Sequence, residues 1–190
     1  MIGRRVFLVQ MVSAAAAVAA PRIARAQSPG MSRANAYAFS FKTLDGGVVR
    51  LAEFSGRPIL IVNVASQCGF TPQYAGLKGL QDRFGEKIAI IGVPSNEFNQ
   101  EPGGTSEILA TAKDHYGVSF PLTEKAALRG PDAHPFYRWA VAERPLDAPS
   151  WNFHKYLVGR DGRFAAAFPT RIEPMDARVI EAIARELKGD

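Results

Sequence analysis

Cys68 is the only cysteine in this chain of 190 residues, and it stands where α/β proteins often carry out chemistry. The aliphatic run at residues 58–65 (PILIVNVA) predicts a strand and residues 72–84 predict a helix, so Cys68 lies between the two. Ligands bind at this edge of open α/β sheets, where backbone N–H groups and the helix dipole favour a thiolate over a thiol. Unpaired cysteines are also commonly buried and inert, so position alone leaves both alternatives open.

The residues that follow Cys68 limit what its thiol can do. Residues 68–71 (CGFT) occupy the place where a thioredoxin-like fold carries C-x-x-C, with Thr71 at the second cysteine position. Dithiol–disulfide exchange within the motif is therefore excluded. A single thiolate can still attack an electrophile such as a peroxide O–O bond, which gives a sulfenic acid that outside thiols must reduce.

The elements that must position Cys68 follow one another in an order typical of a single α/β domain. We expect a hairpin at 39–51, strands at 58–65, 87–94 and 120–123, helices at 72–84, 105–116 and 132–143, a second hairpin at 153–168 and a closing helix at 174–187. This order predicts a central mixed sheet flanked by helices, with parallel strands in the middle and a hairpin at one edge.

The first 26 residues are typical of an export signal. Arg4 and Arg5 precede an apolar stretch at 6–20, and residues 24–26 (ARA) form a small-x-small cleavage site. The arginine pair resembles a twin-arginine signal of bacteria. The alternative is an amphipathic helix that stays attached, but a periodic polar face is missing. We therefore expect a periplasmic protein with a linker at 27–36 and one domain over 37–190.

The net charge of +5 points to nucleic acid only at first sight, because the expected signal carries much of it. Of 23 basic residues, four arginines lie in the first 26 positions together with no acidic residue, which leaves 19 basic residues against 18 acidic ones. This near balance, without a polybasic run, excludes nucleic acid as the expected partner. The three histidines fall on different elements without ligand spacing, so neither a metal nor another cofactor is expected.

Three separate blocks of sequence resemble the signature blocks of the glutathione peroxidase family. They are residues 63–71 (NVASQCGFT), 92–103 (GVPSNEFNQEPG) and 151–157 (WNFHKYL). The similarity extends over about residues 37–188 and keeps the blocks in order. It implies a thioredoxin-like fold and a peroxidase that uses thiols to reduce hydrogen peroxide and organic or lipid hydroperoxides.

The resemblance also implies an active site of four residues. Cys68, Trp151 and Asn152 match the family, and Glu97 stands where the family has glutamine. The indole N–H of Trp151 and the amide of Asn152 are donors that suit a thiolate or a peroxide oxygen. Without the three blocks, Trp151 would be interpreted as a core aromatic residue and Asn152 as a turn residue.

Glu97 is the main departure from the family pattern. A glutamine donates through its amide group, whereas an ionised carboxylate cannot donate. An ionised Glu97 near Cys68 would oppose the thiolate, and a neutral one could donate an O–H bond or a proton. Alternatively, Glu97 points to solvent or pairs with a basic residue. The loop is also one residue shorter than is common in the family, so Gln100 is another candidate for the missing amide.

Two absences limit the expected partners. Because the chain has no second cysteine, Cys68 must be regenerated by glutathione, another small thiol or a thioredoxin-like protein. Residues 143–150 are short where tetrameric members carry an insertion, so the resemblance implies a monomer whose open site accepts bulky lipid hydroperoxides, membrane lipids included. Two other functions remain open, namely a binding module whose site is weakened at Glu97 and a monothiol enzyme that reduces mixed disulfides.

Overall fold

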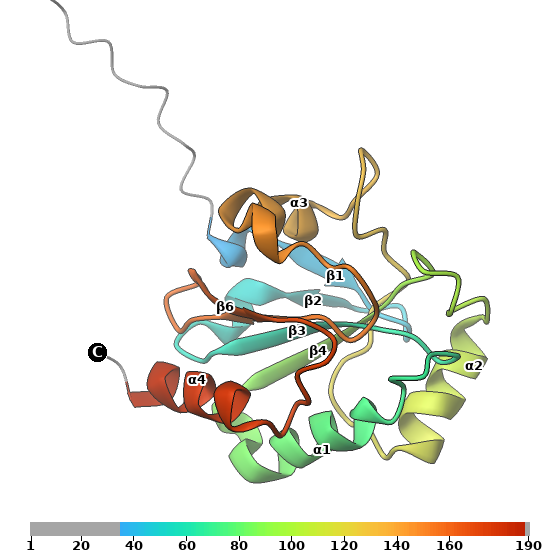
Figure 1. The fold of residues 1–190 in the computed structure, drawn as a ribbon, viewed down its shortest axis with the longest axis horizontal. Coiled ribbons are helices and arrows are strands. Elements are labelled where there is room, and N and C mark those ends of the chain that lie inside the picture. The colour runs from blue at the N-terminus through green and yellow to red at the C-terminus, as the bar shows by residue number, and fades with distance from the viewer. Residues whose placement is uncertain (1–34, 189–190) are drawn as a thin grey trace, which may run out of the picture. The chain divides into compact units, whose positions relative to one another are not determined.

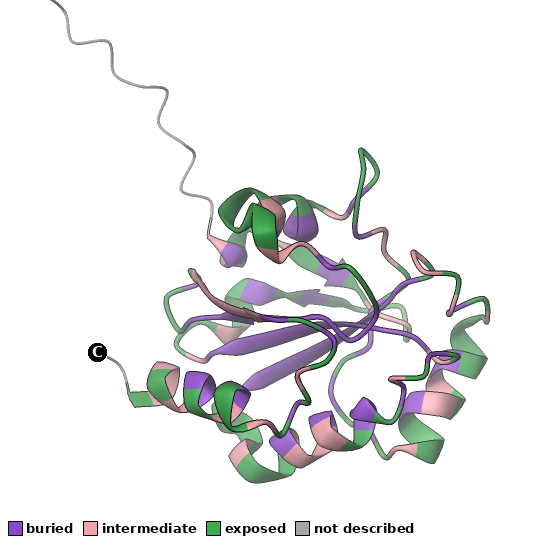
Figure 2. Cartoon of the chain, viewed as in Figure 1, coloured by how far each residue is buried: buried purple, intermediate pink, exposed green. Residues whose placement is uncertain are grey.

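Strand β3 (Ile59–Val64) is buried along its whole length, as the aliphatic run predicts, and it forms the middle of a four-stranded sheet. It pairs in parallel with β4 (Ala89–Pro94) and antiparallel with β5 (Lys155–Val158), which pairs in turn with β6 (Phe164–Phe168). The order β4-β3-β5-β6 confirms the predicted mixed sheet with a hairpin at one edge. The expectation that the parallel strands lie in the middle is wrong, because the parallel pair β3–β4 ends at the opposite edge. Figure 2 shows β3 and β4 coloured as buried throughout.

The computed structural model describes residues 35–188, which form a unit of their own. The expected export signal and most of the expected linker therefore lie outside the described residues. The expected N-terminal hairpin is confirmed as β1 (Ser40–Lys42) and β2 (Val48–Arg50), which form a separate two-stranded antiparallel sheet. Within the described part of the chain, no helix is both long enough and apolar enough to cross a membrane.

The two faces of the sheet are covered by different helices (Figure 1). Leu60 and Val62 pack on one side with α1 (Gln73–Phe84) and α4 (Ala177–Lys188). Their neighbours Ile59 and Ile61 point to the other side, because successive strand residues alternate between faces. There they meet the hairpin β1–β2 and α3. The sheet is thus the middle of three layers, which explains its continuous apolar strands.

Two of the predicted helices differ in the structure, one in where it begins and the other in its helix type. The predicted helix at 132–143 begins three residues later as α3 (Pro135–Glu143), because His134 caps it and Pro135 occupies its first turn. The predicted helix at 105–116 consists of α2 (Thr105–Leu109) and a π-helical continuation, Ala110–His115.

The predicted strand at 120–123 is wrong, although its residues do lie beside β4. Gly92 donates its N–H to the Pro121 carbonyl (3.0 Å) and accepts from the Thr123 N–H (2.9 Å), which makes only an isolated bridge. Pro121 has no N–H, so the ladder cannot extend through it. A Cβ on Gly92 would lie 2.6 Å from the Leu122 side chain, so this approach requires glycine.

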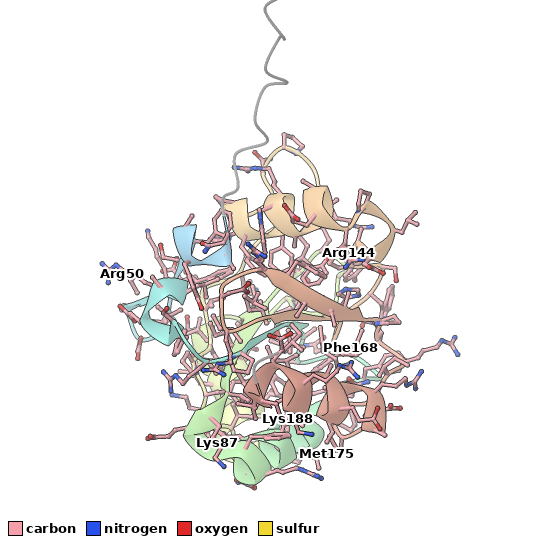
Figure 3. All side chains as sticks on the ribbon, turned by 90° about the vertical axis from the view of Figure 1, so that its left-hand side faces the viewer. Arg50, Lys87, Arg144, Phe168, Met175 and Lys188 are labelled. Atoms are coloured by element: carbon pink, nitrogen blue, oxygen red, sulfur yellow. The ribbon has the colours of Figure 1, made fainter. Side chains whose placement is uncertain are left out.

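The segment between β6 and α4 contacts α1 and the residues before β5, since the Thr170 carbonyl accepts from Gln73 and the Thr170 hydroxyl donates to the Asn152 carbonyl. Figure 3 labels its two ends, Phe168 on β6 and Met175 before α4. Phe168 is buried and belongs to the same apolar cluster as Val179 and Ile183 of α4. This packing fixes where the intervening residues leave the sheet.

Candidate active site

Cys68 lies in a tight turn after β3, as the sequence predicts. Its own N–H donates to the Thr71 hydroxyl (3.1 Å), and that hydroxyl donates to the Ala65 carbonyl (2.9 Å). The N–H of Phe70 donates to Cys68 Sγ (3.4 Å), a contact that stabilises negative charge on sulfur. Cys68 as a whole residue is 7% exposed, so it is buried in this turn. Thr71, at the second cysteine position, therefore stabilises the turn.

A buried carboxyl group braces the same turn. Glu101 is fully buried, and its Oε2 accepts from both the N–H (2.8 Å) and the hydroxyl (3.0 Å) of Ser66. Burial raises the pKa of Glu101. Sequence reasoning did not identify this role, although the Gln-Glu-Pro sequence of the second block was the available signal.

The segment Trp151–Asn152–Phe153 leads into β5, which pairs with β3 on the side opposite β4. Phe153 has φ of 59°, in the left-handed region that a bulky side chain rarely adopts. Its N–H donates to the Asn63 carbonyl (2.6 Å), which ties the segment to the strand that leads to Cys68. Backbone strain of this kind persists where surrounding contacts determine the conformation, and it is common at functional sites.

Each carbonyl of this segment accepts a hydrogen bond from a different side chain. The donors are Asn63 Nδ2 to Trp151 (3.0 Å), Thr170 Oγ1 to Asn152 (2.7 Å) and Lys155 Nζ to Phe153 (2.7 Å). All three donors come from buried residues. The backbone that carries the two predicted donor residues is therefore held in one position.

Lys155 is the centre of this bracing. It is fully buried, and its Nζ also donates to Gln73 Oε1 (2.5 Å) and to the Ile172 carbonyl (2.6 Å). Burial lowers the pKa of Lys155 to about 8, so at neutral pH an ammonium group meets three acceptors. Sequence reasoning missed this residue, since a lysine in a strand gives no sign of burial.

Gln100 joins the two halves of the site. Its backbone carbonyl accepts from the N–H of Gln67 (3.0 Å), the residue before Cys68. Its side-chain Oε1 accepts from Asn152 Nδ2 (3.1 Å). Asn152 is fully buried, so water does not compete for this hydrogen bond. Because the bond uses Oε1, the Nε2 group of Gln100 remains the part of the side chain that can donate.

The carboxylate of Glu97 is held elsewhere in the same loop. Its Oε2 accepts from the Leu128 N–H (3.2 Å), and its Oε1 lies 3.5 Å from Nε of Arg129. This arrangement corresponds to the alternative in which Glu97 pairs with a basic residue. The structure thus brings Gln100 rather than Glu97 into contact with Asn152, and a catalytic role for Glu97 stays a prediction.

Trp151 is the most exposed of the predicted site residues, at 38%. The centroid of its ring lies 5.2 Å from that of Phe98, with the two rings tilted by 35°. The Arg129 guanidinium lies 4.8 Å from the centroid of the Phe98 ring. Glu97 therefore orients Arg129, which covers the aromatic neighbour of Trp151. This chain of contacts gives Glu97 a supporting position at the rim of the site.

These contacts predict opposite results for two substitutions. Gln100→Ala removes the amide that contacts Asn152 and should slow oxidation of Cys68 by hydrogen peroxide at least about tenfold. Glu97→Gln keeps an oxygen for the Leu128 N–H and loses only a half-exposed ion pair, so the rate should change by less than about twofold. Rapid-mixing kinetics on both variants measures these rates. A large change in Glu97→Gln with none in Gln100→Ala would instead give Glu97 the family glutamine's role.

Comparison with known proteins agrees with this geometry. The glutathione peroxidase family model matches residues 36–141. A hydroperoxy fatty acid reductase of Synechocystis sp. is 44% identical over 149 residues, which cover 73% of this chain and 88% of the relative. The Escherichia coli thioredoxin/glutathione peroxidase BtuE is 36% identical, with 75% and 91% covered. The crystal structure of T. cruzi GPX1 superposes with a TM-score of 0.64 at 25% identity, covering 82% of this chain and 98% of that one. The fold is accordingly thioredoxin-like, and the chain belongs to the glutathione peroxidase family of thiol-dependent peroxidases.

Proposed function

We propose that the chain reduces organic hydroperoxides, including those of fatty acids, by oxidation of Cys68 and its regeneration by external thiols. The observation that carries the proposal is the double contact of Gln100, with the backbone beside Cys68 and with the Asn152 amide. This contact unites a thiol and amide donors in one site. The printed name of the Synechocystis relative, a hydroperoxy fatty acid reductase, supports the class of substrate.

In the oxidative step, the Cys68 thiolate attacks the terminal oxygen of the hydroperoxide. An S–O bond forms as the O–O bond breaks, so sulfur loses the two electrons that the peroxide gains. The attacked oxygen stays on sulfur as a sulfenic acid, and the departing alkoxide takes up a proton to leave as an alcohol. The amides of Asn152 and Gln100 and the indole of Trp151 are donors suited to the charge that develops on the departing oxygen.

In the reductive step, a first thiol attacks the sulfenic sulfur, releases water and forms a mixed disulfide with Cys68. A second thiol then attacks the mixed disulfide, leaves as a disulfide and restores the Cys68 thiol. Both thiols must come from outside because the chain has no other cysteine. The printed name of BtuE includes both thioredoxin and glutathione, which supports either a dithiol protein or a small thiol as reductant.

The test is single-turnover oxidation of the reduced chain by a linoleic acid hydroperoxide and by hydrogen peroxide, with mass detection of the sulfenic acid. We expect both rate constants to exceed that of free cysteine by orders of magnitude. Multiple turnover with glutathione and with a thioredoxin system then identifies the reductant. Oxidation no faster than that of free cysteine would instead favour a binding module, and faster reaction with mixed disulfides than with peroxides would favour a monothiol oxidoreductase.

We also propose that the protein acts in the periplasm as a monomer. The support is the arginine pair, the apolar stretch and the cleavage sequence in the first 26 residues, together with the short segment at 143–150. N-terminal sequencing of the protein recovered from the periplasm and light scattering of the purified chain test these two points. An uncleaved cytoplasmic protein, or a stable tetramer, would contradict them.

A further inference from the structure

A cavity of about 340 Å³ opens beside the active-site turn. Its lining consists of Phe70, Ser150, Trp151, Pro169, Thr170 and Arg171. Cys68 itself is not part of the lining, but Phe70 is, and the Phe70 N–H donates to Cys68 Sγ (3.4 Å). Trp151, a predicted site residue, forms another wall. The cavity therefore borders the site already described.

The walls differ in chemistry along the cavity. Phe70, Trp151 and Pro169 present apolar surface, which favours a hydrocarbon chain. Arg171 is the one charged residue of the lining. It is exposed, and among residues 35–188 it takes part in no ion pair. The site thus combines an apolar surface with a cation that forms no ion pair with a carboxylate of the described residues.

The backbone on both sides of Arg171 is firmly held. The Thr170 carbonyl accepts from Gln73 Nε2 (2.7 Å), and the Ile172 carbonyl accepts from Lys155 Nζ (2.6 Å). The Ile172 N–H also donates to the Pro169 carbonyl (2.9 Å), which closes a turn around Arg171. This turn lies between Phe168 and Met175, which are both labelled in Figure 3. A side chain on such a turn is presented from a fixed position, which lowers the entropic cost of binding.

The same contacts fix Arg171 relative to the predicted catalytic residues. Thr170, its direct neighbour, donates its hydroxyl to the Asn152 carbonyl (2.7 Å). Lys155 holds the Phe153 and Ile172 carbonyls with one ammonium group. These hydrogen bonds hold Arg171 and Asn152 at a fixed distance from each other. Such an arrangement suits a substrate that is recognised at one end and reacts at the other.

We propose that Arg171 binds the carboxylate of a free fatty-acid hydroperoxide whose chain lies on Phe70, Trp151 and Pro169 and whose peroxide reaches Cys68. The inference rests on the proposed function and adds the group that selects among lipid substrates. A guanidinium binds a carboxylate through two parallel hydrogen bonds. An esterified lipid, a methyl ester and hydrogen peroxide all lack that carboxylate. The chain should therefore prefer the free acid to its ester.

The test compares linoleic acid hydroperoxide with its methyl ester, both below their aggregation concentrations, in single-turnover oxidation of the full chain. Arg171→Gln should lower the rate constant for the acid about tenfold, while the rates for the ester and for hydrogen peroxide stay unchanged. Arg163→Gln is the matched control, because Arg163 is also an exposed arginine but does not line the cavity. Equal effects of Arg171→Gln on acid and ester, or no effect on the acid, would overturn the proposal.

Two further measurements separate this proposal from its alternatives. If Arg171→Gln slows only the reduction of the sulfenic acid by glutathione, Arg171 serves the thiol and the proposal is wrong. Binding of the unreactive hydroxy fatty acid, followed by tryptophan fluorescence, isolates recognition from chemistry. The site is supported if the hydroxy acid binds more tightly than its methyl ester and if Arg171→Gln weakens that binding. If the chain shows this binding but reacts slowly with hydroperoxides, the proposed function alone fails.

Discussion

Replacement of Cys68 by serine should lower the rate of hydroperoxide reduction at least about a thousandfold, because the substitution removes the only thiol in the chain. A serine hydroxyl is not a nucleophile at neutral pH without an activating base, and it cannot form a sulfenic acid. The fold should survive, since serine fits the same volume and the turn depends on backbone and Thr71 contacts. Steady-state turnover of linoleic acid hydroperoxide, with circular dichroism to verify folding, measures this loss.

Thr71→Val is the matched control for that experiment. It retains Cys68 and removes the hydroxyl that joins the Cys68 N–H to the Ala65 carbonyl, so it should reduce the rate much less than Cys68→Ser does. Residual turnover in Cys68→Ser at more than a few per cent of the unmodified chain would sink the assignment of Cys68 as nucleophile, whatever the fold of the variant.

Acidification should destabilise the protein between about pH 6.5 and pH 4 through His154. This residue is 4% exposed, packs 4.7 Å from the Tyr156 ring and neighbours Lys155 along the chain. Burial first, and the charge of Lys155 second, lower the pKa of His154 to about 4. In the unfolded chain the pKa is about 6.5, so the unfolded state binds the proton first as the pH falls. The free energy of unfolding should therefore drop by about 3 kcal/mol across this range.

Urea unfolding of the chain and of His154→Gln at several pH values measures this contribution. His154→Gln lacks the titrating ring, so its free energy of unfolding should fall by about 3 kcal/mol less than that of the unmodified chain over this pH range. Replacement of the exposed His115 by glutamine is the control and should leave the pH profile of the unmodified chain in place. Buried carboxyl groups such as Glu101 titrate in all three proteins and cancel in the comparison. Identical pH profiles for the chain and His154→Gln would contradict the prediction.

The local features at Cys68 were largely predictable from the sequence. The aliphatic run before it, the proline and helical spacing after it and the missing second cysteine are all short-range signals, and the structure shows the corresponding strand and helix. Cys68 therefore lies at the carboxyl end of β3, as predicted. The second hairpin was equally accessible, because its turn and its alternating apolar residues are close together in the chain.

The contacts that complete the site could not be predicted, because they join residues far apart in sequence. Nothing local to Lys155 shows that its ammonium group will meet acceptors on three segments, or that Gln100 will contact Asn152. The orientation of Glu97 depends likewise on Arg129 from another loop. Such contacts follow from the packed fold, whereas a family signature gives only the identities of the residues that make them.

The covered edge of β4 has a consequence for self-association. A strand at the edge of a sheet presents free N–H and C=O groups on which another chain can add a strand. Here Gly92 uses both of its backbone groups on the segment of Pro121 and Thr123, and Ala126 donates to the Pro94 carbonyl (3.0 Å). The backbone groups that an incoming strand would need at Gly92 and Pro94 are therefore already hydrogen-bonded within the chain. A fully apolar strand is thereby kept from acting as a template for aggregation, and the glycine that permits the close approach protects solubility as well as shape.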